Sequence, residues 1–272
     1  LAMPTLAFRE SRGYLSIYML GVLPVMTQNA LAFLSAVCAF AIICRLQRPG
    51  HAGIKLAYAL MLIPALLTLV LAQSRTSVIA LVLALLVYLI FDRRYALLGV
   101  VIVVTLVGSF FTSVYDASYQ YLLRGQDVQL VTTLSGRTEG WEKAWQAFLQ
   151  SPIAGQGFAA FARANILGTT GMSSMHGAVF DVLVGTGLLG FIPWAAAILW
   201  TFLRLARLSL NGHPWFAGLI GRSLQAEMMG VAVLILVRAS TSSGLALHQD
   251  NLMLFLAVLA YVASMRHAVA SQ

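Results

Sequence analysis

The sequence predicts an all-α fold, a polytopic transmembrane helix bundle of about seven spans with one long outer loop. Two observations predict this class. Of the 272 residues, 60% are hydrophobic and only 10% are charged, whereas soluble domains carry about a quarter charged residues. A spanning helix needs about 20 apolar residues, so seven spans and the loop account for the whole chain.

Seven apolar runs with almost no charge define the expected spans. They are residues 26–44, 54–72, 77–91, 95–115, 178–203, 215–237 and 250–265. Residues 15–25 are apolar but short and contain Pro24, so they form either a half-helix or the remnant of an earlier span. Because the chain also begins without an initiator Met, we expect a fragment that lacks upstream helices.

The basic residues of the short loops predict the orientation. Alternation of the spans places these cations on one side, namely Arg45, Arg48, Lys55, Arg93, Arg94, Arg204, Arg207 and Arg266. Lys and Arg are enriched in cytoplasmic loops, so we expect a single multi-pass membrane domain, residues 1–272, with this side in the cytoplasm. The opposite side then receives residues 73–76, a long loop of residues 116–176, and residues 238–249.

The net charge of +8 is expected to serve orientation and contact with anionic membrane lipids. Nucleic-acid binding would need a soluble basic surface, and the sequence has none in evidence.

The long loop contains an expected amphipathic helix over residues 138–150. Three aromatic residues share one face of it, namely Trp141, Trp145 and Phe148. Trp prefers the membrane–water interface, so this helix is expected on the outer surface of the bundle. Ser151-Pro152 ends it, and Gly155 and Gly157 allow an unusual backbone path afterwards.

Two arginines at the outer side are candidates for binding phosphate groups. Arg75 lies in a very short turn between two apolar runs, and its planar fork suits bidentate phosphate binding. The alternative is a snorkelling arginine that touches lipid phosphate. Arg137 precedes the amphipathic helix, where a helix N-terminus attracts anions. The alternative there is a solvated arginine beside an ordinary Thr138 cap.

His176 opens the fifth apolar run and is the candidate for proton transfer near neutral pH. The alternative is an interfacial polar residue. Asp181 lies five residues on, roughly 140° round a helix, and is a poor partner for His176. It is expected to be satisfied inside the bundle, by another helix or by a buried cation.

The last outer loop is bracketed by Arg238, His248 and Asp250, and Asp250 is a candidate to orient a catalytic imidazole, as carboxylates often do. Within the sixth run, Arg222 and Glu227 are five residues apart, so each is expected to pair with another helix as a structural clamp.

The sequence lacks a Walker A loop, a dinucleotide-binding glycine pattern, a D-x-D pair and zinc-ligand spacing. We therefore expect neither cofactor nor metal. Chemistry on the outer face without a nucleotide requires a pre-activated donor, which in membranes is a polyprenyl diphosphate.

Together these residues resemble the O-antigen ligase and O-antigen polymerase family of bacterial membrane glycosyltransferases. The resemblance runs from Gln73 to Trp194 and depends on the order of several short pieces. These are Ser74-Arg75-Thr76, Ser135-Gly136-Arg137 with Trp141, residues 151–158, His176, and residues 185–190. One departure is Gly177, since many members have Asn after this histidine.

The resemblance implies lipopolysaccharide biosynthesis, by transfer of a glycan from undecaprenyl diphosphate to a hydroxyl, that of the lipid A-core in the ligases. It implies a multi-pass protein of the bacterial inner membrane with a periplasmic site. In that site Arg75 and Arg137 hold the donor diphosphate, and His176 is the base or orients the acceptor. A polymerase or a protein O-oligosaccharyltransferase would use the same site. A lipid-binding membrane transporter is the alternative from another class, although transporters place their charges near the membrane midplane.

Overall fold

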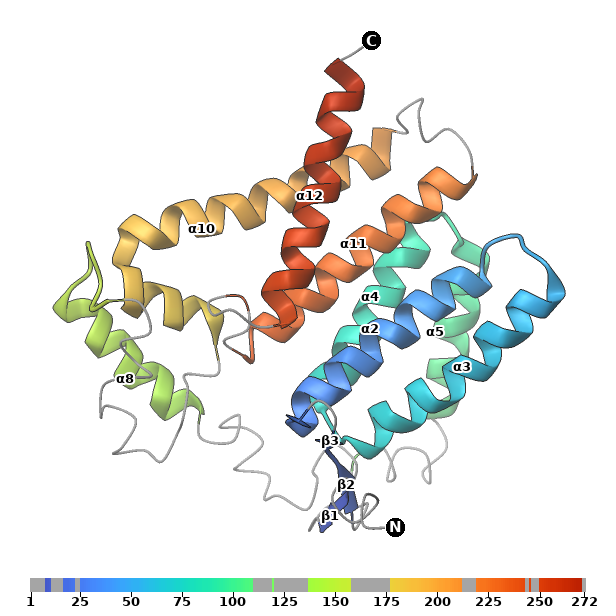
Figure 1. Cartoon of the computed structure of the whole chain (residues 1–272), viewed down its shortest axis with the longest axis horizontal. Coiled ribbons are helices and arrows are strands. Elements are labelled where there is room, and N and C mark those ends of the chain that lie inside the picture. The colour runs from blue at the N-terminus through green and yellow to red at the C-terminus, as the bar shows by residue number, and fades with distance from the viewer. Residues whose placement is uncertain are drawn as a thin grey trace. The chain divides into compact units, whose positions relative to one another are not determined.

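The computed structural model describes residues 8–10, 17–22, 25–109, 119, 137–157, 177–211, 219–242, 245 and 250–270. These residues form eight helices and four very short strands (Figure 1), so the predicted all-α class is confirmed. The chain divides into two compact units, which are described separately. The first comprises Leu1–Val128 with Ser209–Leu234, and the second Gln129–Leu208 with Ile235–Gln272.

The first unit is built from apolar helices, and short turns join the four that are consecutive in the chain, α2 to α5. They are α2 (Gln28–Leu46), α3 (Ala52–Leu71), α4 (Arg75–Phe91), α5 (Tyr95–Ser109) and the first part of α11 (Leu219–Ala239). Each corresponds to one of the predicted apolar runs, because long runs without charge satisfy their backbone hydrogen bonds best as helices.

The core of the first unit forms where small residues let α2 approach its neighbours. Ala32, Ala36 and Ala39 are fully buried on α2. Phe40 packs edge-on against Tyr88 of α4, with 6.1 Å between ring centroids. On α11, a Cβ added at Gly230 would lie 2.1 Å from the Phe40 ring. Small residues at helix contacts are the usual means of close packing in membranes.

The second unit contains α8 (Arg137–Gln150), α10 (Ala178–Asn211), α12 (Asp250–Ala270) and the end of α11. The predicted amphipathic helix is therefore confirmed. Ala144, Ala147 and Phe148 of α8 are buried against Leu183 and Val184 of α10. One face of α8 thus packs on another helix, while Trp145 stays 46% exposed.

The N-terminal segment contains strands where a half-helix was one expectation. Strand β1 (Phe8–Glu10) pairs antiparallel with β2 (Ile17–Met19), and β3 (Gly21–Val22) pairs with β4 (Val25–Met26). For the described residues of this segment, the expectation of a half-helix is therefore wrong. Branched residues such as Ile17, Val22 and Val25 favour extended backbone, and the run is too short to gain from helix formation.

Three helices in the described part of the chain are long and apolar enough to cross a membrane: Gln28–Leu46, Ala52–Leu71 and Ala178–Leu208. Shorter apolar helices cover Arg75–Phe91, Tyr95–Val104 and Asn251–Ala263. Many large apolar side chains on α3 and α5 are exposed, which is the expected state of helix faces that contact lipid.

Candidate functional site

Helix α10 is broken at Gly187, which has φ 61° and ψ −162°. The helix turns sharply between its short first part and its long remainder (Figure 1). An unbroken helix would join the Leu188 and Leu189 amides to the Val184 and Gly185 carbonyls. The break frees all four groups, and such groups are costly when they lack partners away from water.

Residues 152–157, directly after α8, provide partners for all four of these groups. The Leu188 and Leu189 amides donate to the carbonyls of Pro152 and Ile153, at 2.9 and 3.1 Å. The carbonyls of Val184 and Gly185 accept from the amides of Gln156 and Gly157, at 2.8 and 2.9 Å. The segment is therefore inserted into the broken helix and replaces each missing bond with two new ones.

The insertion requires glycine at two positions. A Cβ on Gly155 would lie 2.5 Å from the Gly187 amide nitrogen, and a Cβ on Gly187 would lie 2.4 Å from the Ile153 carbonyl oxygen. Both glycines have positive φ, as does Gly157. The unusual backbone path predicted for Gly155 and Gly157 is confirmed. The matching break in α10 was not predicted, although Gly185-Thr186-Gly187 is a signal for one.

The first turn of α8 and the start of α10 meet at an aromatic contact. Trp141 stacks on Phe180, with 5.5 Å between ring centroids and 21° between planes. A Cβ on Gly177 would lie 3.3 Å from the Trp141 indole nitrogen and 3.8 Å from the Ser240 carbonyl oxygen. Three segments therefore converge: the first turns of α8, the residue that precedes α10, and the turn that follows α11.

The turn after α11 is closed by hydroxyl groups. The hydroxyls of Thr241 and Ser242 donate to the Arg238 carbonyl at 3.3 and 2.9 Å. The side-chain amide of Asn251, at the start of α12, donates to the Ser242 hydroxyl at 3.3 Å. The end of α11 and the beginning of α12, whose first residue is Asp250, are thereby held together.

Arg75 lies in the first unit and is the first residue of α4. Two residues earlier, the buried Gln73 has a left-handed backbone conformation, with φ 50°. This conformation lets the chain reverse between α3 and α4. Ser74 bonds the Ser77 hydroxyl at 3.0 Å and makes no side-chain cap to the helix. The turn is as short as predicted, and Arg75 with its guanidinium group belongs to the positive N-terminal end of α4.

Several predicted site residues can now be located. Arg137 is the first residue of α8, Asp181 lies in the first turn of α10, and Arg238 lies in the last turn of α11. His176 and His248 lie outside the described residues, as do the side chains of Arg137 and Asp250. The segments next to His176, Arg137 and Arg238 converge within the second unit, while the convergence of Arg75 with them stays a prediction.

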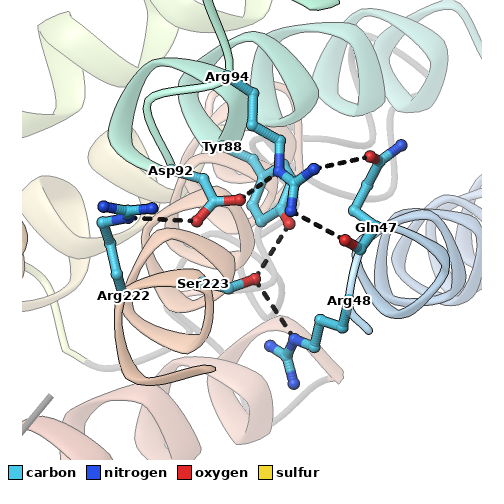
Figure 2. Close-up of polar contacts among 7 residues, drawn as sticks. All are labelled: Gln47, Arg48, Tyr88, Asp92, Arg94, Arg222 and Ser223. Carbon is cyan, nitrogen blue, oxygen red and sulfur yellow. Dashed lines mark hydrogen bonds and ion pairs between the residues drawn. The ribbon is translucent and has the colours of Figure 1, made fainter. Parts of the chain in front are cut away.

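A separate charged cluster joins α2, α4 and α11 at the end of α4 opposite Arg75. Glu227 is 3% exposed and pairs with Arg45, at 2.6 Å, and with Arg48. Arg48 also donates to Ser223, whose hydroxyl bonds Tyr88 at 3.1 Å (Figure 2). The prediction that Glu227 pairs with another helix is confirmed.

The second half of this cluster is centred on Asp92, which follows α4. Asp92 accepts from Arg94 at 2.5 Å and lies 3.7 Å from the Arg222 guanidinium (Figure 2). Arg94 also donates to the Gln47 carbonyl at 2.8 Å, which satisfies a carbonyl at the end of α2. The bond to Asp92 raises the pKa of Arg94. Sequence reasoning assigned Arg45, Arg48 and Arg94 to orientation alone and missed this structural role.

The helices and the inserted loop define a multi-pass α-helical membrane protein. The sequence model of a family described as O-Antigen ligase matches residues 60–195, which is half of the chain. The chain belongs to the O-antigen ligase family and is a membrane glycosyltransferase of the ligase or polymerase type. No curated protein matches it. The matched range includes Arg75, Arg137, His176 and the contact between Gly155 and Gly187.

Proposed function

We propose that this protein transfers a glycan from undecaprenyl diphosphate to an acceptor hydroxyl, that of the lipid A-core, on the periplasmic face of the bacterial inner membrane. Family membership supports the reaction class. The contact between Gly177 and Trp141 carries the assignment to residues. It brings the backbone next to His176 against the helix that begins at Arg137, so a base and a phosphate-binding group belong to one region.

The donor diphosphate is held by Arg75 and Arg137 in this proposal. Each arginine is the first residue of a helix, where the first amides and the helix dipole favour an anion. A guanidinium at the same position adds a full charge and a bidentate fork. The two arginines therefore neutralise the negative charge that grows on the diphosphate as it leaves.

His176 accepts the proton of the acceptor hydroxyl. The acceptor oxygen forms a bond to the anomeric carbon of the glycan, the bond from that carbon to the diphosphate oxygen breaks, and undecaprenyl diphosphate leaves with the electron pair. Because the diphosphate activates the donor, the step needs no nucleotide or metal. The supporting residues, which orient the imidazole or the substrates, are Asp181, Arg238, His248 and Asp250.

The charged cluster supports the proposed orientation. It gathers Arg45, Arg48, Arg94 and Arg222 at one end of the first unit. Arg75 is at the other end of α4, and a 17-residue helix is about 25 Å long. The positive-inside rule makes the arginine-rich end cytoplasmic, so Arg75 belongs at the periplasmic surface.

The break in α10 bears on the transporter alternative, since transporters use broken helices near the membrane midplane. Here the break follows only nine helical residues, and residues 188–208 form a further 21-residue helical stretch, about 31 Å long. That stretch alone is long enough to cross the membrane. The break therefore belongs near one membrane surface, which favours a surface reaction over a midplane transport site.

The direct test is to incubate the purified protein with an undecaprenyl-diphosphate-linked glycan and separate acceptors, followed by mass spectrometry of the products. We expect a glycosylated lipid A-core and released undecaprenyl diphosphate. Elongated lipid-linked glycan would instead identify a polymerase, and a modified protein acceptor an O-oligosaccharyltransferase. Movement of the intact donor across vesicles without transfer would identify a transporter.

A further inference from the structure

The far end of α10 carries a cavity of about 260 Å³, which is distinct from the proposed transfer site. The described residues that line it are Trp200, Leu203, Arg204 and Arg207. These residues recur at helical spacing and share one face of α10. The adjacent face, with Thr201, Leu205 and Leu208, is buried in the protein.

The two cations of this cavity are Arg204 and Arg207. Within the described part of the chain, neither Arg204 nor Arg207 has a hydrogen-bond or ion-pair partner. This contrasts with Arg45, Arg48 and Arg94, which pair with buried carboxylates. The cavity therefore presents two guanidinium groups whose charges are available to an external anion.

The apolar surface that leads to the cavity favours a lipid as the source of that anion. Ile192, Leu199 and Leu203 are 62%, 59% and 47% exposed along the same side of α10. Trp200, 41% exposed, follows Ile192 and Leu199 and lies one helical turn before Arg204. Trp typically marks the level of the headgroups, with acyl chains on its apolar side and charge on its polar side.

The length of α10 places the cavity at the second headgroup layer. Arg207 is 19 residues after Leu188, and this helical separation is about 28 Å. A hydrocarbon core is about 30 Å thick. Because the break belongs near one membrane surface, Arg207 lies at the level of the opposite headgroups, and the long side chain of Arg204, one turn earlier, extends to the same level.

We propose that Trp200, Leu203, Arg204 and Arg207 form a binding site for one anionic phospholipid of the cytoplasmic leaflet. Its phosphate is bound by the two guanidinium groups, and one acyl chain lies along Leu199 and Ile192. The site needs an anionic lipid because a zwitterionic headgroup would bring its own cation beside the arginines. The orientation follows the topology given under the proposed function, but lipid binding does not depend on glycan transfer.

Native mass spectrometry of the full chain in detergent tests this site. Titration with phosphatidylglycerol should show one bound lipid that the R204Q/R207Q variant holds about 30-fold more weakly, because each basic residue near an anionic surface contributes about one kcal/mol. The matched control is K55Q/R93Q, which also removes two positive charges, one on α3 and one in the turn after α4, and it should bind as the wild type does. Equal weakening in both double variants would mean general attraction to the surface and would overturn the site.

Fluorescence gives a second test that does not depend on folding of the arginine variants. The fluorescence of Trp200 is obtained by subtracting the emission of the Trp200→Phe variant from that of the wild type. In vesicles, brominated phosphatidylglycerol should quench this fluorescence more strongly than brominated phosphatidylcholine does. Equal quenching by the two lipids would contradict the proposal. Displacement of the lipid by soluble glycerol phosphate would also contradict it, since the site would then bind phosphate alone.

Discussion

Gly155 and Gly187 lie backbone against backbone, so a Cβ on Gly155 would be 2.5 Å from the Gly187 amide nitrogen. The contact joins the loop after α8 to the break in α10, and the amides and carbonyls freed by the break find their partners in that loop. A loop that must replace helical hydrogen bonds cannot move independently of the helix. The contact therefore fixes the position of α8 relative to α10, and with it the region that includes Arg137 and Gly177.

Gly187→Ala and Gly155→Ala should each destabilise the protein by about 2–4 kcal/mol, because the added methyl meets backbone atoms and both sites have positive φ. Thermal unfolding in detergent measures this. Gly99→Ala is the control, since a Cβ there meets nothing within 4 Å and Ala is the better helix former. If all three variants unfold at the same temperature, the tight contact is absent in the protein.

Arg75→Ala and Arg137→Ala should each lower glycan transfer at least about 100-fold, since each removes charge stabilisation from the leaving diphosphate. The assay is product formation from a lipid-linked glycan, with membrane insertion checked in parallel. Lys143→Ala, on the same helix as Arg137, should retain activity. Wild-type transfer by both arginine variants would remove their role in binding the donor.

His176→Ala should lower kcat by about 100-fold or more and leave the affinity for the lipid-linked donor unchanged, because a general base acts in the transition state. Single-turnover rates and donor titration separate the two effects. A variant that loses donor affinity but keeps its rate at saturation would show that His176 binds the donor and is not a base.

Trp141→Ala should reduce transfer while α8 still folds, because Trp141 contacts the Gly177 backbone that follows His176. Its matched control is Trp145→Ala on the same helix, whose side chain is largely exposed. Initial rates and Tm are measured for both variants. Equal activities would mean that the contact between Trp141 and Gly177 does not position the site.

Glu227→Gln should destabilise the first unit by about 3 kcal/mol, since Arg45 and Arg48 would lose the buried carboxylate that both contact. Glu142→Gln removes the same charge from an exposed position on α8 and should change Tm little. The comparison of the two melting temperatures is the measurement. Similar values would mean that the cluster contributes no stability.

Much of the secondary structure could be predicted because a bilayer allows few alternatives. An uncharged run of about 20 residues in lipid must form its backbone hydrogen bonds within itself, so each of the seven predicted runs contains a helix among its described residues. Prediction failed at Ile17–Met19, Gly21–Val22 and Val25–Met26, which form strands and belong to a segment too short for that constraint. Prediction also missed the cluster around Asp92. Charged residues at the end of an apolar run already have an explanation in membrane orientation, so the sequence gives no sign that they also pair with one another.

The candidate site was predictable only in part. Arg75 and Arg137 were recognised because arginine next to a helix start has a definite chemistry with phosphate, and both prove to be the first residues of helices. The insertion of residues 152–157 into α10 could not be foreseen in the same way. Its hydrogen bonds join residues about thirty positions apart, and glycine in an apolar run is compatible with an unbroken helix.

Patterns along the chain were enough to identify a helical membrane protein of the O-antigen ligase family and to show which cations lie at the ends of its helices. The folded arrangement was needed to learn that Glu227 pairs with two arginines, that Gly155 meets Gly187, and that Trp141 lies against the residue after His176. The two kinds of information differ because the underlying interactions differ in range. Helix formation depends on neighbouring residues and on the solvent, whereas ion pairs and backbone contacts between helices depend on distances that no local pattern contains.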